Sequence, residues 1–75
     1  MKTLLEVKIN NCYKIVKVNK QLPVPVYKRL TELGITPGNN IALLIKNKIA
    51  KSGIVRIWGS MISLDYYILS NIEVE

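Results

Sequence analysis

The sequence predicts a mostly-β domain with short helices, a small SH3-like β-barrel of about five strands. Its 75 residues are enough for one core, because a chain of this size buries only about 60% of its unfolded surface. Apolar residues make up 49% of the chain, without Phe and with many β-branched side chains, which favours strands. A few short strands suit a bent barrel that hides its edges better than a two-sheet sandwich. We therefore expect residues 1–75 to form a single domain.

Extended segments dominate the first part of the chain. Residues 5–9 alternate apolar and polar side chains, which predicts an extended arm lying against the core. Asn10 and Asn11 then predict a turn, with Asn11 in the left-handed conformation. Residues 13–18 are nearly continuously apolar and predict a core strand. The prolines within residues 22–25 predict a connector, since proline lacks an amide donor.

One helix is predicted after this connector. It begins at Val26, because Val26, Leu30 and Leu33 recur at the helical spacing. Gly34 is expected to end it in the left-handed conformation, with Ile35 closing the hydrophobic contact behind it. The Thr-Pro-Gly-Asn sequence that follows predicts a type II turn.

The second half of the chain predicts a meander of strands. In order, it contains a strand at 41–46, a polar loop at 47–53, a strand at 54–58, a tight turn at 59–60, a strand at 61–64, one helical turn capped by Asp65 that carries Ile68, Leu69 and Ile72, and a final strand at 73–75. All the glycines, including Gly53, are expected at turns, where they allow backbone conformations that other residues avoid.

The net charge of +6 favours an anionic partner. The basic residues, Lys46 among them, are spread over alternating strands, where a solvated lysine is the ordinary finding, so a soluble basic surface is favoured. Glu6 and Lys8 interrupt the apolar N-terminus too early for a signal peptide. The lone cysteine, Cys12, favours a reducing compartment. We therefore expect a cytoplasmic protein.

Reactive side chains are scarce in this chain. It has no histidine, which removes the commonest general base near neutral pH. Cys12 lacks a neighbouring base and is expected to be a half-buried structural thiol. Glu73 and Glu75 share a strand face, where a solvated edge is favoured over a weak cation site. The sequence predicts no enzyme, no metal site and no cofactor.

Arg56 and Trp58 form an Arg-x-Trp pair in a predicted strand. Exposed on the outer face, such a pair would suit docking to protein or nucleic acid. Plain packing of the indole over the barrel edge is the favoured alternative. The tyrosines do not gather with Trp58 into a platform for stacking bases.

Several segments together resemble one family: Tyr13 to Val18, the Leu30 to Gly38 run with its L-x-x-L-G-I-x-P-G pattern, Ile54 to Gly59, Leu64, and Asn71 to Val74. The chain resembles the FeoA family from Leu4 to Glu75. This resemblance implies an SH3-like fold and a small cytosolic accessory protein of ferrous iron uptake. It also implies a partner, FeoB, which is a membrane transporter with a cytosolic GTPase domain.

The first functional hypothesis is docking onto a FeoB-like transporter, which would make the protein membrane-peripheral through its partner. The helix face carrying Tyr27, Lys28 and Arg29 is a candidate contact, with Arg56 and Trp58 as further candidates. The alternative is a small basic barrel that binds nucleic acid. The aromatic pattern argues against it, so we expect no nucleic-acid partner. A regulatory module akin to the SH3-like domain of iron-dependent repressors is a third hypothesis. Homo-oligomerisation is left open.

Overall fold

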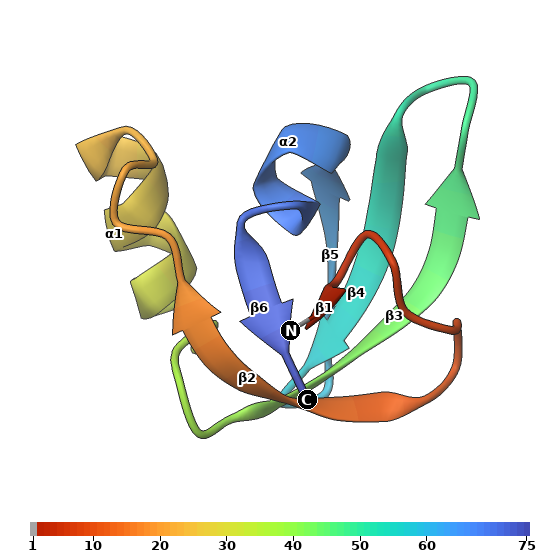
Figure 1. Cartoon of the computed structure of the whole chain (residues 1–75), viewed down its shortest axis with the longest axis horizontal. Coiled ribbons are helices and arrows are strands. Elements are labelled where there is room, and N and C mark those ends of the chain that lie inside the picture. The colour runs from red at the N-terminus through yellow and green to blue at the C-terminus, as the bar shows by residue number, and fades with distance from the viewer. Residues whose placement is uncertain (1) are drawn as a thin grey trace.

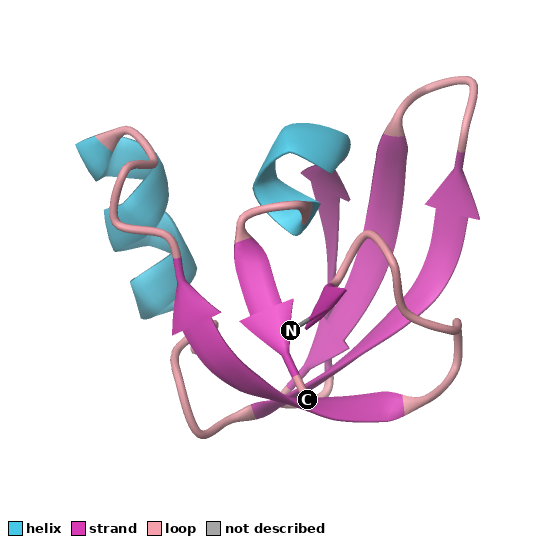
Figure 2. Ribbon diagram, in the orientation of Figure 1, coloured by secondary structure: helices cyan, strands magenta, loops and turns pink. Residues whose placement is uncertain are grey.

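The computed structural model describes residues 2–75, and six strands form one antiparallel sheet that bends around the interior (Figure 1). The elements are β1 (Lys2–Thr3), β2 (Cys12–Val18), α1 (Val24–Glu32), β3 (Asn40–Asn47), β4 (Ser52–Ile57), β5 (Ser60–Asp65), α2 (Tyr66–Leu69) and β6 (Ile72–Val74). The strand order is β1-β6-β2-β3-β4-β5. Figure 2 shows both helices towards the upper side of the view. The predicted mostly-β architecture with short helices is confirmed, with one more strand than the five or so expected.

Every long strand and both helices contribute side chains to one core. Its buried members are Leu4, Val7, Ile15, Val18, Leu22, Leu30, Ile35, Ile41, Leu43, Val55, Ile57, Leu64, Leu69, Ile72 and Val74. Within residues 2–75, no charged or polar residue is fully buried. The core is therefore aliphatic, as the absence of Phe requires, and it holds the sheet and helices in fixed relative positions.

A β-bulge in β3 decides which side chains face the core. The pairing with β4 shifts register between Leu43 and Ile45, so that Leu43 lies opposite Val55 and Ile45 opposite Ile54. Leu43 is buried, whereas Ile45, two residues later, is 54% exposed. A regular strand would have put both on one face, and the extra residue of the bulge reverses the alternation.

The same bulge sets the position of Lys46, which follows Ile45 on β3 and is exposed. Lys46 pairs with the buried Gly53 and donates from Nζ to the carbonyl oxygen of Leu5 at 2.7 Å. Its ammonium also lies 5.8 Å from the ring centroid of Tyr66. Lys46 is exposed, as expected for the basic residues, and its ammonium is in addition held by the Leu5 carbonyl.

Helix α1 begins earlier than predicted. It starts at Val24 rather than Val26, because Pro25 stands in the first turn, where a missing amide breaks no helical hydrogen bond. Its end is as predicted: Gly34 is left-handed, with φ of +87°, and donates to the carbonyl of Thr31 at 3.0 Å. Ile35 donates to the carbonyl of Leu30 at 2.9 Å. These two bonds make a Schellman motif, and they confirm the predicted cap.

The predicted type II turn after the helix is also confirmed. Asn39 donates its amide to the carbonyl of Thr36 at 3.2 Å, and Gly38 has φ of +95°. The side-chain amide of Asn39 donates to the carbonyl of Gly34 at 2.7 Å. Gly38 donates to the carbonyl of Ile15 at 2.8 Å, which fastens the turn to β2.

The N-terminal segment differs from its prediction. The strand is β1, at the start of the chain, and residues 5–9 form turns rather than an extended arm. Glu6 donates its amide to the carbonyl of Thr3, and its carboxylate accepts from both the amide and the hydroxyl of Thr3 at 3.0 Å each. The left-handed residue that follows is Asn10, with φ of 65°, rather than Asn11. The local hydrogen bonds between Thr3 and Glu6 therefore favour a turn over the extended arm that the alternating pattern predicted.

The Glu6 carboxylate is expected to titrate below its ordinary value of 4.5, because the Thr3 amide and then the Thr3 hydroxyl hydrogen-bond to its ionised form and lower its pKa. The ionised Glu6 carboxylate stabilises the folded chain at pH values above this ordinary pKa. This stabilisation is lost as the pH falls through the lowered pKa. An NMR titration of the Glu6 side chain measures this pKa. In Thr3→Val, which keeps the amide and removes the hydroxyl, the midpoint should move part of the way back up. An ordinary midpoint in the wild-type chain would contradict this.

The turn between β4 and β5 lies one residue earlier than predicted. Strand β4 ends at Ile57, and the two-residue turn is Trp58-Gly59, with φ of 52° and 82°. Positive φ at both central residues is the signature of a type I′ hairpin turn. The predicted strand at 54–58 and turn at 59–60 were therefore wrong by one residue, because tryptophan is not an expected turn residue.

Two smaller corrections concern Gly53 and Ile72. Gly53 lies inside β4, not at a turn, and an added Cβ would come within 3.0 Å of the carbonyl oxygen of Ile45 and of Leu43 and Leu69 side-chain atoms. The lack of space for a Cβ atom, rather than a need for positive φ, explains why glycine stands at this position. Asp65 caps α2 as predicted, accepting from the amide of Ile68 at 2.9 Å. Ile72 belongs to β6 and not to the helical turn.

Candidate docking surface

The structure distributes the predicted contact residues over separate surfaces. The helix groove is lined by Lys20, Leu22, Val24, Tyr27, Lys28, Thr31 and Glu32. The edge groove is lined by Pro25, Val26, Arg29, Leu30, Leu33, Ile62, Ser63, Leu64 and Ile68. The turn hollow is lined by Gly38, Asn39, Asn40 and Trp58. Tyr27 and Lys28 therefore share one surface, Arg29 lies on a second and Trp58 on a third, and Arg56 lines none of them.

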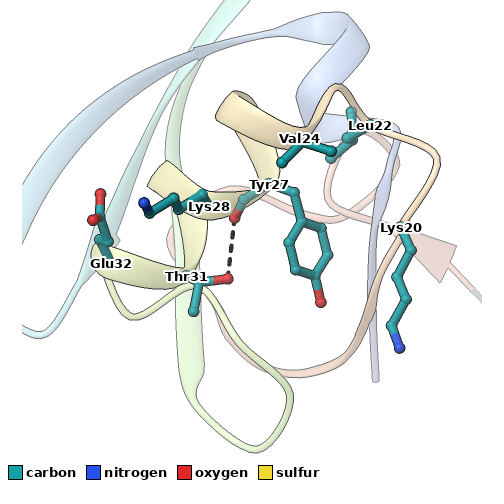
Figure 3. Close-up of a pocket in the computed structure, with 7 residues that line it drawn as sticks. All are labelled: Lys20, Leu22, Val24, Tyr27, Lys28, Thr31 and Glu32. Atoms are coloured by element: carbon teal, nitrogen blue, oxygen red, sulfur yellow. Dashed lines mark hydrogen bonds between the residues drawn. The ribbon is translucent and has the colours of Figure 1, made fainter.

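The helix groove has an apolar floor and a charged rim. It encloses about 610 Å³ beside α1. Leu22 is buried and Val24 is 78% exposed, so the floor presents aliphatic surface to solvent. Figure 3 shows the Tyr27 ring standing between the helix and the Lys20 side chain. Thr31 donates its hydroxyl to the Tyr27 carbonyl at 3.0 Å, within the helix. Lys20 and Lys28 outweigh the single carboxylate of Glu32, so the rim is net positive and suits an acidic partner that also carries apolar groups.

Trp58 dominates the turn hollow. The indole is 77% exposed, which is unusual for the largest side chain. Its edge covers Gly34: a Cβ on that glycine would lie 2.7 Å from the Cδ1 atom of the indole. The left-handed glycine of the helix cap therefore makes room for the indole edge.

Arg56 lies in the ladder of β4, opposite Ala42 on β3 and Met61 on β5. It is exposed on the outer face of the sheet, beside Met61, which is itself exposed. The Arg-x-Trp pair on one strand face, which was the less favoured hypothesis, does not form, because Trp58 belongs to the turn and its indole lies against Gly34 at the end of α1. Arg56 and Trp58 do not form a single site through strand alternation.

The site chemistry of residues 2–75 is limited. Across this part of the chain, no group of three or more cysteine or carboxylate side chains is arranged to hold a metal ion. Cys12 is exposed, so its predicted half-burial was wrong: it lies on the outward side of β2, where it pairs with Ala42 of β3. The buried Tyr66 hydroxyl has no hydrogen-bond partner among the described residues, and nothing in the structure explains it.

Sequence patterns did not identify Asn39 or Ser63 as surface-forming residues. Asn39 holds the turn hollow in shape through its bond to Gly34, and its place after Pro-Gly is the signal that could have found it. Ser63 belongs to a groove whose walls come from distant parts of the sequence. Neither α1 nor α2, the helices of the described chain, has the length and apolar character to cross a bilayer.

The fold and these surfaces define a class: a small antiparallel barrel that offers grooves and an exposed aromatic ring for contact with another molecule. The chain belongs to the FeoA domain family, whose profile matches residues 2–75. The resemblance predicted from the sequence is thus confirmed. No curated protein matches the chain in sequence.

Solved structures share this fold over almost the whole chain. Iron(II) transport protein A from Clostridium thermocellum is 19% identical, with a TM-score of 0.84 over 97% of this chain and 44% of that one. FeoA from Stenotrophomonas maltophilia, an SH3 domain protein solved with zinc, is 18% identical, with a TM-score of 0.84 over 100% of this chain and 91% of that one. The SH3-like prediction is confirmed by this likeness.

The fold also occurs in metal-dependent regulators. ScaR with bound zinc is 24% identical, with a TM-score of 0.84 over 100% of this chain and 36% of that one. The chain thus spans about a third of this regulator and less than half of the Clostridium thermocellum protein. At these identities the likeness concerns the fold alone.

Proposed function

We propose that this chain is a non-catalytic, cytoplasmic accessory protein of ferrous iron uptake that binds a FeoB-like transporter on its cytosolic side. Membership in the FeoA domain family supports this function. The scarcity of reactive groups in the sequence, which has no histidine, fits a protein that acts by contact. We further propose that residues 1–75 work as one domain.

The observation that carries the proposal is Trp58. Its φ of 52° is costly for a bulky residue, and asparagine or glycine would suit this turn position better. Its 77% exposure means that core burial does not offset this cost. Strained, exposed residues concentrate at functional sites, and tryptophan is enriched among the anchors of protein interfaces. A docking role accounts for the presence of tryptophan here better than folding does.

The remaining candidate contacts are Tyr27, Lys28, Arg29 and Arg56. Tyr27 and Lys28 line the helix groove on α1, the helix whose C-terminal cap is covered by the Trp58 indole. A partner that engages the end of α1 could therefore reach both surfaces. The net charge of +6 favours an acidic partner face and faster association.

The experiment compares Trp58→Asn with the wild-type chain in binding to the FeoB-like transporter from the same genome. Asparagine suits the positive φ, so the variant should fold with a stability within about 1 kcal/mol of wild type. Its affinity for the transporter should fall at least tenfold, as expected for loss of an aromatic anchor, or about 1.4 kcal/mol.

Ile49→Asn is the matched control, because Ile49 is an apolar residue that is 97% exposed on the β3–β4 loop, away from the α1 cap. It should bind like wild type. Equal affinities of Trp58→Asn and wild type would overturn the role of Trp58. An equal loss in both variants would indicate non-specific hydrophobic contact.

Nucleic-acid binding is the less favoured function. The lining of the turn hollow, within the described residues, contains no lysine or arginine beside Trp58. Stacking surfaces for bases usually combine aromatic rings with such cations. The basic residues are dispersed over the barrel instead of forming one phosphate-binding stripe.

A further inference from the structure

Strand β5 has one edge that no other strand covers. It is the last strand of the sheet and pairs only with β4 among the described elements. The two-residue turn makes Ile57 and Ser60 a hydrogen-bonded pair, and such pairs recur at every second position. Ile62 and Leu64 therefore bond towards β4, whereas the amides and carbonyls of Met61 and Ser63 point to the free edge.

The edge groove runs beside this free edge. Its lining includes Ile62, Ser63 and Leu64 of β5, residues of α1, and Ile68 of α2. Its volume is about 360 Å³. The groove thus combines unpaired backbone groups on one wall with aliphatic side chains on the other. Helix-and-strand walls of this kind accept an extended peptide as an additional strand.

The charge of the groove selects among peptides. Arg29 is the only charged residue in the described lining, and it lies in the last turn of α1. A guanidinium binds a carboxylate through two parallel hydrogen bonds, which is stronger than an ordinary neutral hydrogen bond. An apolar floor with one cation at its rim therefore matches a segment that carries aliphatic side chains and one carboxylate.

We propose that the edge groove binds an extended polypeptide segment of a partner protein, which adds as a strand to β5 at Met61 and Ser63. Alternate apolar side chains of the segment contact Val26, Leu30 and Leu33, and a carboxylate of the segment pairs with Arg29. This goes beyond the proposed function, because it concerns the backbone form of the ligand and not the identity of its owner. A membrane or a nucleic acid fits less well, since the groove is concave, largely apolar and carries one cation.

The test uses a synthetic hexapeptide amide, acetyl-Thr-Val-Thr-Val-Thr-Glu-NH2, whose β-branched residues favour an extended conformation and whose Glu side chain is its one carboxylate. Its matched control is the same peptide with alternate backbone amides methylated, which keeps every side chain and removes amide donors. Amide chemical shifts of the wild-type chain are followed by NMR during titration. Saturable shifts centred on Met61 and Ser63 are expected, and methylation should weaken binding about tenfold, as for loss of paired hydrogen bonds.

Variants of the chain test the same geometry. Ser63→Pro removes the outward amide without touching the β4 ladder, and edge strands tolerate proline at such positions. It should weaken hexapeptide binding about tenfold relative to Ser63→Ala, which retains the amide. Arg29→Gln should weaken binding of this peptide more than binding of the same peptide with Gln in place of its Glu, which has no carboxylate.

The proposal is overturned if the methylated peptide binds as well as the unmodified one, a result that does not depend on any variant folding. It is also overturned if the shifts centre on Tyr27 and Lys28, which would assign the peptide to the helix groove. Absence of saturable shifts at millimolar peptide overturns it as well. Loss of FeoB-like binding in Trp58→Asn is a separate result, so the two proposals can fail independently.

Discussion

Leu43→Ala is expected to cost about 3–5 kcal/mol of unfolding free energy, the range for a fully buried leucine that leaves a cavity. Leu43 has no exposed surface and lies in the core beside Gly53 and Val55. The stability of the whole domain should be about 4–11 kcal/mol, from the usual contribution per residue. The variant should therefore lose a large share of the domain's stability, and at the lower end of this range it is partly unfolded at room temperature. Urea denaturation followed by circular dichroism measures this.

Ile45→Ala is the matched control for this substitution. It removes an aliphatic side chain two residues along the same strand, but Ile45 is 54% exposed, so the cost should stay below about 1 kcal/mol. The contrast between the two variants tests the bulge directly. Similar costs for both would mean that β3 alternates regularly and that the bulge is absent.

Gly34→Ala is expected to cost about 1–3 kcal/mol, because alanine is strained at φ of +87° and its Cβ would meet the indole of Trp58 at 2.7 Å. The indole is exposed, so it can move aside, but it then loses its contact with the helix cap. Since Trp58 is the only tryptophan, its fluorescence reports this movement. The emission maximum should shift to longer wavelength in the variant.

A double-mutant cycle separates the two contributions at Gly34. In a Trp58→Ala background, Gly34→Ala should retain only the backbone strain, about 1–2 kcal/mol. The difference between the two backgrounds is the steric effect of the indole. An identical cost with and without Trp58 would show that the indole does not lie over this glycine.

The end of α1 was predictable in detail because its structure is determined locally. The hydrogen bonds that define the cap and the turn, donated by the amides of Gly34, Ile35 and Asn39, join residues close in sequence. Left-handed glycine and Pro-Gly turn chemistry operate within a few residues. Motifs of this kind can be recognised without knowledge of the tertiary fold.

The bulge in β3 was not predictable from the alternation of residues 41–46. A regular strand and a bulged strand contain the same apolar residues, and only the pairing with β4 decides between them. Trp58 was assigned to a strand for a similar reason: tryptophan favours strands, and the register of the hairpin overrides that preference. Long-range pairing, which a single sequence does not display, is responsible in both cases.

The candidate surfaces were predicted in part. Tyr27 and Lys28 lie on a common groove, as expected for neighbours on an exposed helix face. The edge groove was missed because one wall comes from α1 and the other from β5 and α2, which lie far from α1 in the sequence. Its defining feature is an unpaired strand edge, and the position of β5 at the end of the sheet becomes evident only from the topology.

Calorimetric titration of the wild-type chain into the purified FeoB-like transporter from the same genome is the most direct measurement of the proposed role. We expect saturable binding with a defined stoichiometry, weakened at least tenfold by Trp58→Asn and unchanged by Ile49→Asn. If the folded wild-type chain gives no saturable binding at hundreds of micromolar, with the transporter in either nucleotide state, it does not act by docking onto this partner.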